Sequence, residues 1–305
     1  MNKILFSILL LITMAPAVLA QDTIRIYYDS KWKEISNKDD AVFYRKAWAV
    51  GNNNWIANDY YINNKIQMTG TFKSKKMEVK HGHFTYFYEN EKKTSEGNYF
   101  EDKFVGLWTA WFENGQKKWE GEYKDNVPDG NWKYWYETGE IKSEGKYLNN
   151  DKSGVWNHWH TNGKLECVET FTKDGNSTFQ SYYETGEKKS EGKYLNNNKS
   201  GVWNHWYTNG KLECVETFAE GGNSTFQSYF ENGAKKCQGI IENYLPDGLW
   251  SYWNSDGRIF LKGKFERGLK TGEWTRYFPN GEEMKLQFKF GVVEGKEFGG
   301  VELSE

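Results

Sequence analysis

The sequence predicts an all-β fold, an elongated antiparallel array of β-hairpins that forms a single twisted sheet. Three observations support this prediction. The eighteen residues that begin at Gly154 occur again from Gly201, 47 positions later, with one exchange, His160 for Tyr207. An aromatic residue recurs every 23 or 24 positions, and in eight units a glycine follows it by seven positions. Repetition at such an interval is typical of arrays built from one supersecondary unit.

The repeated unit extends over most of the chain. Its spacing divides the 47-residue copy into one unit of 24 and one of 23 residues. We therefore expect tandem repeats from 81 to 298, preceded by a cap with one degenerate repeat from 21 to 80 and followed by a tail from 299 to 305. The recurring aromatic residues are Phe84, Trp108, Trp132, Trp156, Phe179, Trp203, Phe226, Trp250, Trp274 and Phe298.

Each unit has the pattern of one hairpin. The glycine usually stands in an N-G, T-G or D-G pair between two strand-like runs. Such pairs predict a two-residue type I′ turn, in which both central residues have positive φ. A turn at Asn114–Gly115 would set Trp108 opposite Gly121, and Gly106 opposite Tyr123. We therefore predict that each large ring lies over a glycine of the neighbouring strand.

A second aromatic column is predicted on the other face of the sheet. Side chains alternate between the faces of a strand, so the ring three positions after Trp108 leaves from the opposite face. Flat amphipathic rings in a row are suited to stacking on sugar rings or to anchoring a partner protein. The alternative is a structural role, with Lys and Glu stems lying over the rings. The column comprises Trp111, Trp135, Trp159, Tyr182, Trp206, Tyr229, Trp253 and Tyr277.

Residues 1–20 have the pattern of a cleavable signal peptide. Lys3 precedes an apolar run from Ile4 to Ile12, and the small-residue exit Val18-Leu19-Ala20 follows. No cysteine stands at the cleavage point, so a lipoprotein anchor is not expected. No later stretch is apolar for long enough to form a transmembrane segment. The protein is therefore expected to be exported to the periplasm or the extracellular space.

Charge and motifs argue against several function classes. The net charge is −2 without a basic block, so no nucleic-acid partner is expected. The sequence lacks a nucleophile elbow, a zinc-protease motif, a P-loop and a dinucleotide fingerprint. We therefore expect neither enzymatic activity nor a cofactor. His158 and His160 share a strand face but have no further ligands placed to complete a metal site.

Three cysteines occupy one position of the repeat. They are Cys167, Cys214 and Cys237. Neighbours in this position are two strands apart, about 10 Å, whereas a disulfide needs Cα atoms within about 7 Å. We therefore expect small, half-buried thiols rather than a disulfide framework.

The repeat resembles a known family. The stretch "SEGKYLNNDKSGVWNHWHTNG", from Ser143 to Gly163, resembles the MORN repeat, and in particular its bacterial variant found in YwqK-type antitoxin proteins. It departs from the eukaryotic pattern because Trp156 replaces the second glycine. The resemblance implies an elongated antiparallel β-strip that binds proteins or lipids and often acts as a scaffold.

The function expected from these features is binding. We expect an exported, non-catalytic repeat protein that offers a protein-binding or scaffolding surface to a protein partner. Two alternatives remain open. One is a cell-surface protein that binds envelope carbohydrate through its exposed rings. The other is a periplasmic antitoxin-like or immunity partner of a toxin.

Overall fold

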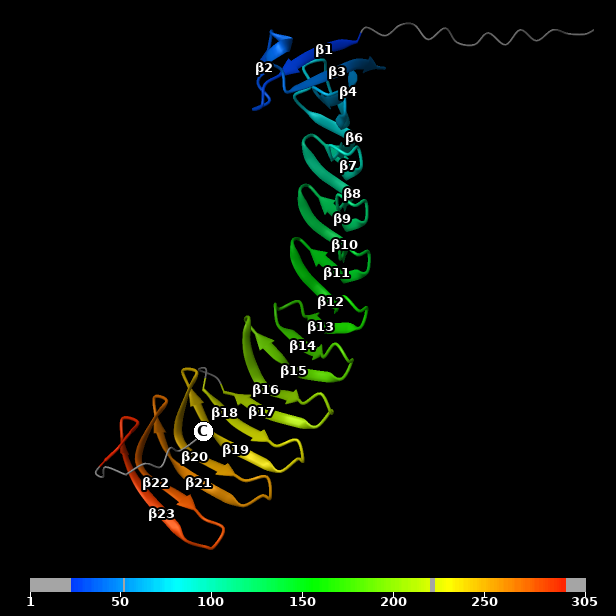
Figure 1. Ribbon diagram of the computed structural model, residues 1–305. Coiled ribbons are helices and arrows are strands. Elements are labelled where there is room, and N and C mark those ends of the chain that lie inside the picture. The colour runs from blue at the N-terminus through cyan, green and yellow to red at the C-terminus, as the bar shows by residue number, and fades with distance from the viewer. Residues whose placement is uncertain (1–22, 52, 220–222, 295–305) are drawn as a thin grey trace, which may run out of the picture. The chain divides into compact units, whose positions relative to one another are not determined.

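The predicted all-β hairpin array is confirmed. The computed structural model describes residues 23–51, 53–219 and 223–294, and the predicted leader and tail lie outside them. Apart from one 3₁₀ turn, η1 (Lys38–Asp40), every element in these ranges is a β-strand (Figure 1). The strands belong to one open antiparallel sheet, and from β3 onward the pairs join strands that are consecutive in the chain.

The chain divides into two units, the first of which ends at Trp108. In this unit β1 pairs with both β2 and β3, and the chain then continues as hairpins. Its strands are β1 (Ile24–Tyr28), β2 (Glu34–Ile35), β3 (Phe43–Val50), β4 (Asn54–Tyr61), β5 (Ile66–Phe72), β6 (Lys80–Phe87), β7 (Lys93–Phe100) and most of β8 (Lys103–Trp111).

A buried ion pair joins β3 to β4 in the first unit. Arg45 donates from Nε to Asp59 Oδ1 over 2.6 Å and from Nη2 to Oδ2 over 2.8 Å. Burial acts to lower the pKa of Arg45, but the hydrogen bonds to Asp59 and the negative charge of that carboxylate together outweigh it and raise that pKa. Because Asp59 is only 3 % exposed, removal of either partner would leave a charge buried without compensation.

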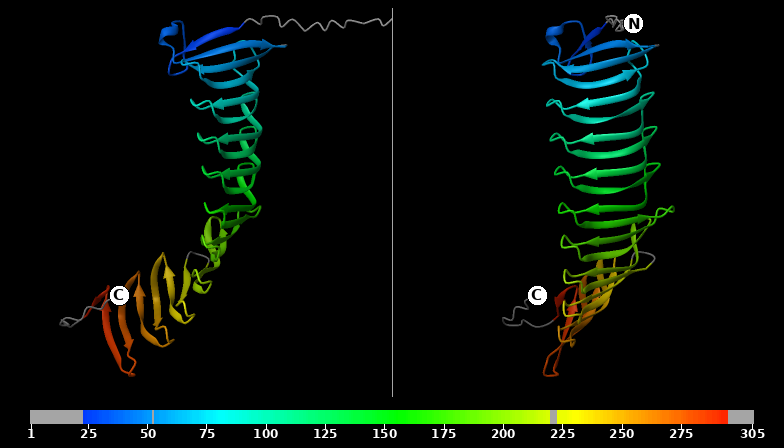
Figure 2. Two further views of the ribbon diagram at one scale, coloured as in Figure 1. Left: turned by 45° about the vertical axis from the view of Figure 1, so that its right-hand side comes forward. Right: turned by 90° about the vertical axis from the view of Figure 1, so that its right-hand side faces the viewer.

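The second unit begins at Thr109 and consists of a succession of hairpins (Figure 2). All its strands are members of the sheet, so within the described residues no second layer covers them. The strands are β9 (Lys117–Lys124), β10 (Val127–Trp135), β11 (Ile141–Leu148), β12 (Asp151–Trp159), β13 (Leu165–Phe171), β14 (Ser177–Tyr182), β15 (Lys188–Leu195), β16 (Asn198–Trp206), β17 (Leu212–Phe218), β18 (Ser224–Tyr229), β19 (Lys235–Glu242), β20 (Leu245–Trp253), β21 (Ile259–Glu266), β22 (Leu269–Tyr277), β23 (Glu283–Lys289) and β24 (Val292–Val293).

The turn at each repeat glycine differs from the prediction. Gly115 has φ of 94°, as expected, but Asn114 is not in the positive-φ region. Gly115 N donates to Phe112 O over 2.9 Å, and Phe112 N donates to Gln116 O over 2.8 Å. This is a three-residue loop, a type I turn closed by a glycine bulge, and the two-residue type I′ assignment is wrong.

The type I′ turns lie at the opposite ends of the strands. Asn149 and Asn150 have φ of 50° and 75°, and Asp125 and Asn126 have φ of 51° and 70°. Asn and Asp tolerate the left-handed region better than other side chains because they hydrogen-bond locally. Asn196 and Asn197 form a third pair of this kind, so three of the hairpins are joined to the next by the D-N or N-N pair that the type I′ turn favours.

In three of the N-G pairs, at Asn114, Asn162 and Asn232, the asparagine bonds to a main-chain carbonyl of the next turn. Asn114 Oδ1 accepts a hydrogen bond from Gln116 N over 2.9 Å, which closes its own turn. Asn114 Nδ2 donates to Glu137 O, in the turn of the next hairpin, over 2.8 Å. Asn162 bonds in the same way to Glu184 O over 3.0 Å. The recurrence of N-G is thus explained by a bond between repeats as well as by turn geometry.

Each buried tryptophan lies against a glycine of the strand before it. A Cβ placed on Gly145 would overlap the indole ring of Trp156, which is 1 % exposed. Trp156 Nε1 also donates to the carbonyl of Lys146, the residue after that glycine, over 3.0 Å. We call this arrangement the ring–glycine contact. It recurs as Trp108 on Gly97, Trp132 on Gly121, Trp203 on Gly192, Trp250 on Gly239 and Trp274 on Gly263.

The predicted strand register is confirmed, but the tryptophan ring lies over the preceding strand instead of the strand that follows it. Trp132 is paired with Gly145 across the glycine turn, as expected, yet its ring covers Gly121 on the preceding strand. A bulge before each ring explains the direction. Two extra residues of β12 lie between the pairs Lys146–Ser153 and Glu144–Asn157, and bulges redirect the side chains that follow them.

Two units lack the glycine, and both carry a smaller ring on the next strand. Glu169 pairs with Phe179, and Glu216 with Phe226. The Glu169 carboxylate accepts from Lys152 Nζ over 2.8 Å and lies 3.3 Å from His158 Nε2. The hydrogen bond with His158, followed by that with Lys152, outweighs burial and lowers the pKa of Glu169 to about 2.

The ring–glycine contact predicts that Gly145→Ala destabilises the protein by roughly 1–3 kcal/mol, the usual cost of overpacking. The added methyl group must displace Trp156, whereas Lys146→Ala, on the same strand, adds no atom near the ring. Urea unfolding followed by tryptophan fluorescence measures both. Combining Gly145→Ala with Trp156→Phe should cost less than the sum of the single changes, because the smaller ring leaves room for the methyl group. Additive costs would contradict this explanation.

The Glu169 cluster predicts a pH-dependent contribution to stability. Because folding lowers the pKa of Glu169 from its ordinary 4.5 to about 2, the ionised carboxylate stabilises the fold above pH 4.5, and this stabilisation disappears as pH falls towards 2. The difference in unfolding free energy between wild type and Glu169→Gln should shrink over that interval. Glu216→Gln is the matched control, because Lys199 Nζ is 3.7 Å away there, and its effect should be smaller. A difference independent of pH would refute the assignment.

Candidate functional site

The eight residues of the predicted aromatic column all lie in the second unit, and all are half-buried. Each stands directly before the residue that begins a glycine turn. Alternation along β12 places Trp159 on the face opposite Trp156, and the other members follow the same rule. We call this side of the second unit the column face. The structure therefore arranges the predicted residues at one interval along a single sheet face.

Lysine side chains lie over three of the rings. Lys117 Nζ is 5.3 Å from the centroid of the Trp135 ring, Lys188 Nζ is 5.2 Å from that of Trp206, and Lys235 Nζ is 5.1 Å from that of Trp253. Each ammonium group is also hydrogen-bonded to the residue three positions later. The partners are Glu120 at 2.6 Å, Glu191 at 2.8 Å and Gln238 at 3.0 Å. The column is thus partly covered by its own lysine stems, as the structural alternative expects, while its rings retain exposed area.

A neighbouring row of rings fixes the backbone of the column. Tyr136 donates from its hydroxyl to Trp159 O over 2.7 Å, and Tyr183 donates to Trp206 O over the same distance. Tyr207 donates to Tyr229 O over 2.8 Å. In the sequence, each of these tyrosines directly follows one column residue. Its hydroxyl then bonds to the backbone of the column residue in the next hairpin. These bonds hold the column residues in fixed positions from one hairpin to the next.

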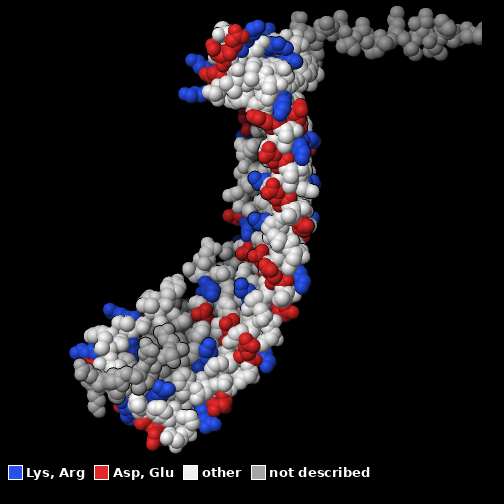
Figure 3. All heavy atoms as spheres, viewed as in Figure 1, with Lys and Arg blue, Asp and Glu red and all other residues white. Residues whose placement is uncertain are grey.

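The charges of the column face are mixed. Lys133, which pairs with Glu120 and Glu144 in the strand register, lies 3.1 Å from the Glu144 carboxylate. Figure 3 shows basic and acidic side chains interspersed along the visible side of the second unit. Such a surface provides no single-sign field for steering a polyanion.

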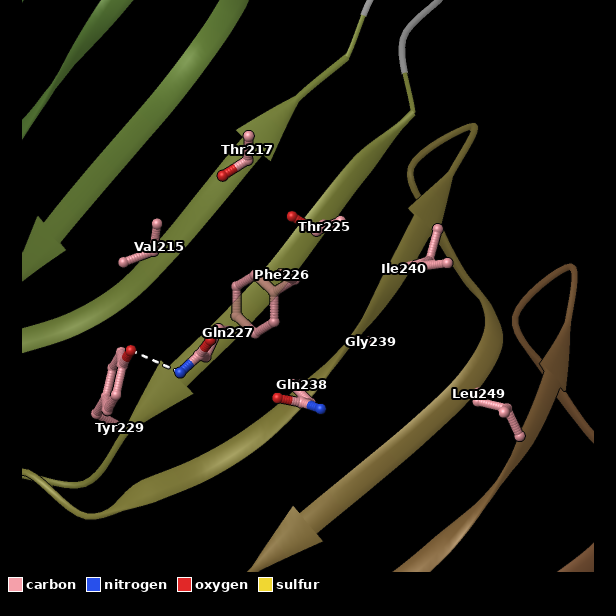
Figure 4. A pocket seen from close by; sticks show the side chains of 10 residues that line it. All are labelled: Val215, Thr217, Thr225, Phe226, Gln227, Tyr229, Gln238, Gly239, Ile240 and Leu249. Carbon is pink, nitrogen blue, oxygen red and sulfur yellow. Dashed lines mark hydrogen bonds between the residues drawn. The ribbon is translucent and has the colours of Figure 1, made fainter.

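A shallow hollow of about 370 Å³ lies on the sheet from β17 to β20 (Figure 4). Tyr229 of the column forms part of its lining, and Gln227 Nε2 donates to the Tyr229 hydroxyl over 2.6 Å. Thr225 and Gln238 add polar groups, and Leu249 adds an apolar wall. Sequence reasoning did not find this hollow, because the residues come from four strands that only the register brings together.

The three cysteines are free and half-buried, as expected. They lie in one cross-strand row in which Cys167 pairs with His158, and Cys214 pairs with His205. Burial raises the pKa of Cys167 to about 11 and that of Cys214 to about 12. These two thiols therefore stay protonated at neutral pH and are poor nucleophiles.

Two features are absent from the part of the chain that the structure describes. No three His, Cys, Asp or Glu side chains there are grouped as metal ligands would be. No helix in the same ranges combines the length and the apolar character needed to cross a membrane.

Comparison with known proteins gives matches of two kinds, and no curated protein matches the chain. One similar solved structure is described as the crystal structure of TcdB2-TccC3-TEV, with 12 % identity and a TM-score of 0.19 over 86 % of this chain and 16 % of that one. The crystal structure of TcdB2-TccC3 gives 9 % identity and a TM-score of 0.18 over 83 % and 17 %. The chain thus spans less than a fifth of either relative.

The MORN repeat variant family matches three consecutive segments, residues 80–101, 104–125 and 128–149. These segments coincide with the hairpins β6–β7, β8–β9 and β10–β11. Repeats of this family suggest a binding role for the repeat protein. The hairpin, its interval and the family match agree, and residues 80–149 of this chain are three consecutive repeats that match the MORN repeat variant.

Proposed function

We propose that the protein is an exported, non-catalytic scaffold that binds a protein partner through the column face. The observation that carries the proposal is the row of eight half-buried rings, placed at one interval on a face that no other described element of the second unit covers. Tyr and Trp anchors supply much of the energy of protein interfaces. A row of them on a repeat array offers the same contact several times over.

The contacts made by the column residues favour binding by lowering its entropic cost. Association normally requires about 0.5–1.5 kcal/mol for each flexible side chain that is ordered at the interface. Trp135, Trp206 and Trp253 are held beneath lysine stems, and hydrogen bonds from Tyr183 and Tyr207 fix the backbone of Trp206 and Tyr229. A partner would therefore meet a surface that is already ordered.

The proposed location follows from the leader. Lys3, the apolar run from Ile4 to Ile12 and the exit at Val18-Leu19-Ala20 support export, so the partner would be a component of the envelope or of the surroundings. An antitoxin-like role is a narrower form of the same proposal, in which the partner is a toxin. A toxin-like reading frame beside the coding sequence would favour that form.

The proposal predicts that changing Trp135, Trp159, Trp206 and Trp253 together to Ala abolishes capture of the partner. The experiment is a pull-down from the envelope fraction of the producing organism, followed by titration of the purified partner against both proteins. The rings are only half-buried, so the variant should retain the strand content of wild type by circular dichroism.

The matched control removes four exposed apolar side chains near the type I′ turns, with Val127, Leu148, Leu195 and Leu269 changed to Ala. This variant should bind as wild type does. Equal capture by wild type and by the four-tryptophan variant would rule out the column face as the binding surface. Turnover of a substrate by the pure protein would end the non-catalytic assignment.

A further inference from the structure

The hollow on β17–β20 differs from the rest of the column face because its lining carries no charged residue. In the row that includes Lys133 and Glu144, the corresponding residues here are Val215, Gln227 and Gln238. The Ile240 and Leu249 side chains are 45 % and 65 % exposed and leave apolar surface open to solvent. A volume of about 370 Å³ lies within the range of small-molecule sites.

Comparison with the near-identical copy 47 residues earlier identifies the residues that make the hollow neutral. Seven of the ten lining residues are the same in both copies, including Tyr229, whose counterpart is Tyr182. The other three differ. The earlier copy has Glu191, Lys193 and Val202 where the hollow has Gln238, Ile240 and Leu249.

The strand register shows that the two positions at which the copies differ in charge are neighbours on the same face of one strand. Gln227 pairs with Gln238 and Thr225 with Ile240, just as Gln180 pairs with Glu191 and Thr178 with Lys193. In the earlier copy Glu191 is engaged by Lys188 at 2.8 Å. A ligand placed there would have to displace the water held by the charged groups of Glu191 and Lys193. In the hollow the corresponding side chains are uncharged, and the nearby Lys235 ammonium group donates to Gln238 over 3.0 Å, so the desolvation cost is lower.

We propose that the hollow binds a neutral saccharide. The Tyr229 ring and the Ile240 and Leu249 side chains offer apolar area for the C–H face of a sugar ring. The amides of Gln227 and Gln238 and the Thr225 hydroxyl can both donate and accept, as sugar hydroxyls require. A carboxylate or phosphate ligand would find no cation among the ten lining residues. Gln227 Nε2 already bonds to the Tyr229 hydroxyl and Gln238 Oε1 accepts from Lys235, so a purely apolar ligand would cover the other polar atoms of these amides, Gln227 Oε1 and Gln238 Nε2, without offering them a partner.

The inference goes beyond the proposed protein scaffold, although the two share Tyr229. Protein capture is read from the four-tryptophan variant, which leaves all ten residues of the hollow unchanged. Saccharide binding is read from changes inside the hollow. The experiments can therefore refute the protein-binding proposal without refuting the saccharide proposal, and the reverse.

The experiment is calorimetric titration of the full mature chain with three neutral oligosaccharides, maltohexaose, cellohexaose and chitohexaose. At least one should bind at a single site with a dissociation constant in the millimolar range or tighter. Gln238→Glu combined with Ile240→Lys should weaken that binding about tenfold or more. This variant reproduces residues that the earlier copy carries in the same strand positions, so it should fold as wild type does.

Three further variants separate the site from the rest of the face. Tyr229→Ala should abolish binding, whereas Tyr182→Ala, the same change in the earlier copy, should leave it unchanged. The reverse exchange, Glu191→Gln with Lys193→Ile, should create a second site and raise the stoichiometry towards two. The proposal is overturned if no oligosaccharide binds at millimolar concentration, or if binding is insensitive to Gln238→Glu with Ile240→Lys. Binding of an anionic oligosaccharide in preference to the neutral ones would overturn it as well.

Discussion

The contact of an indole ring with the backbone of a glycine is the interaction on which the rest of the sheet depends. A single-layered sheet has no opposite layer against which to bury apolar side chains, so a core must form within the sheet itself. Glycine makes this possible because it lets the ring lie flat on the backbone of the neighbouring strand. Six tryptophans become 1–5 % exposed in this way, and each donates its indole N–H to a main-chain carbonyl. Their large rings supply the burial that a composition of only 37 % hydrophobic residues would otherwise lack.

The repeat, the strand positions and the register follow from periodicity alone, whereas the turn type and the direction of the rings do not. An N-G pair is compatible with a two-residue and with a three-residue loop. The choice depends on neighbouring hairpins, because Asn114 donates to the carbonyl of Glu137 in the next turn. The direction of Trp132 depends on a bulge, which inserts residues into one strand and cannot be counted from the spacing of rings. Both outcomes are set by contacts between units, and the pattern within a unit does not contain them.

The candidate surface was predictable to a similar extent. The eight column residues could be named from alternation, since a half-buried ring on the second face needs only the period of a strand. The cover over Trp135 could not be predicted, because it depends on where the stem of Lys117 lies after its ammonium group has bonded to Glu120. The hollow is a stronger example. Gln238 and Ile240 look like ordinary variation along the chain, and their effect is visible only beside Gln227 and Thr225 on the preceding strand.

The ring–glycine contact also limits how the gene for this chain can grow. Each contact crosses a unit boundary, with a residue of one hairpin meeting the ring of the next. From Gly145 onward, the residue that faces each ring from the preceding strand is alternately Gly and Glu. The pairs are Gly145 with Trp156, Glu169 with Phe179, Gly192 with Trp203 and Glu216 with Phe226. Duplicating the Trp156 hairpin by itself would set a glutamate against a tryptophan at the new junction. Duplicating both hairpins, 47 residues, reproduces a correct junction at each end. In this part of the chain, the shortest insertion that preserves every ring and its partner is a pair of hairpins.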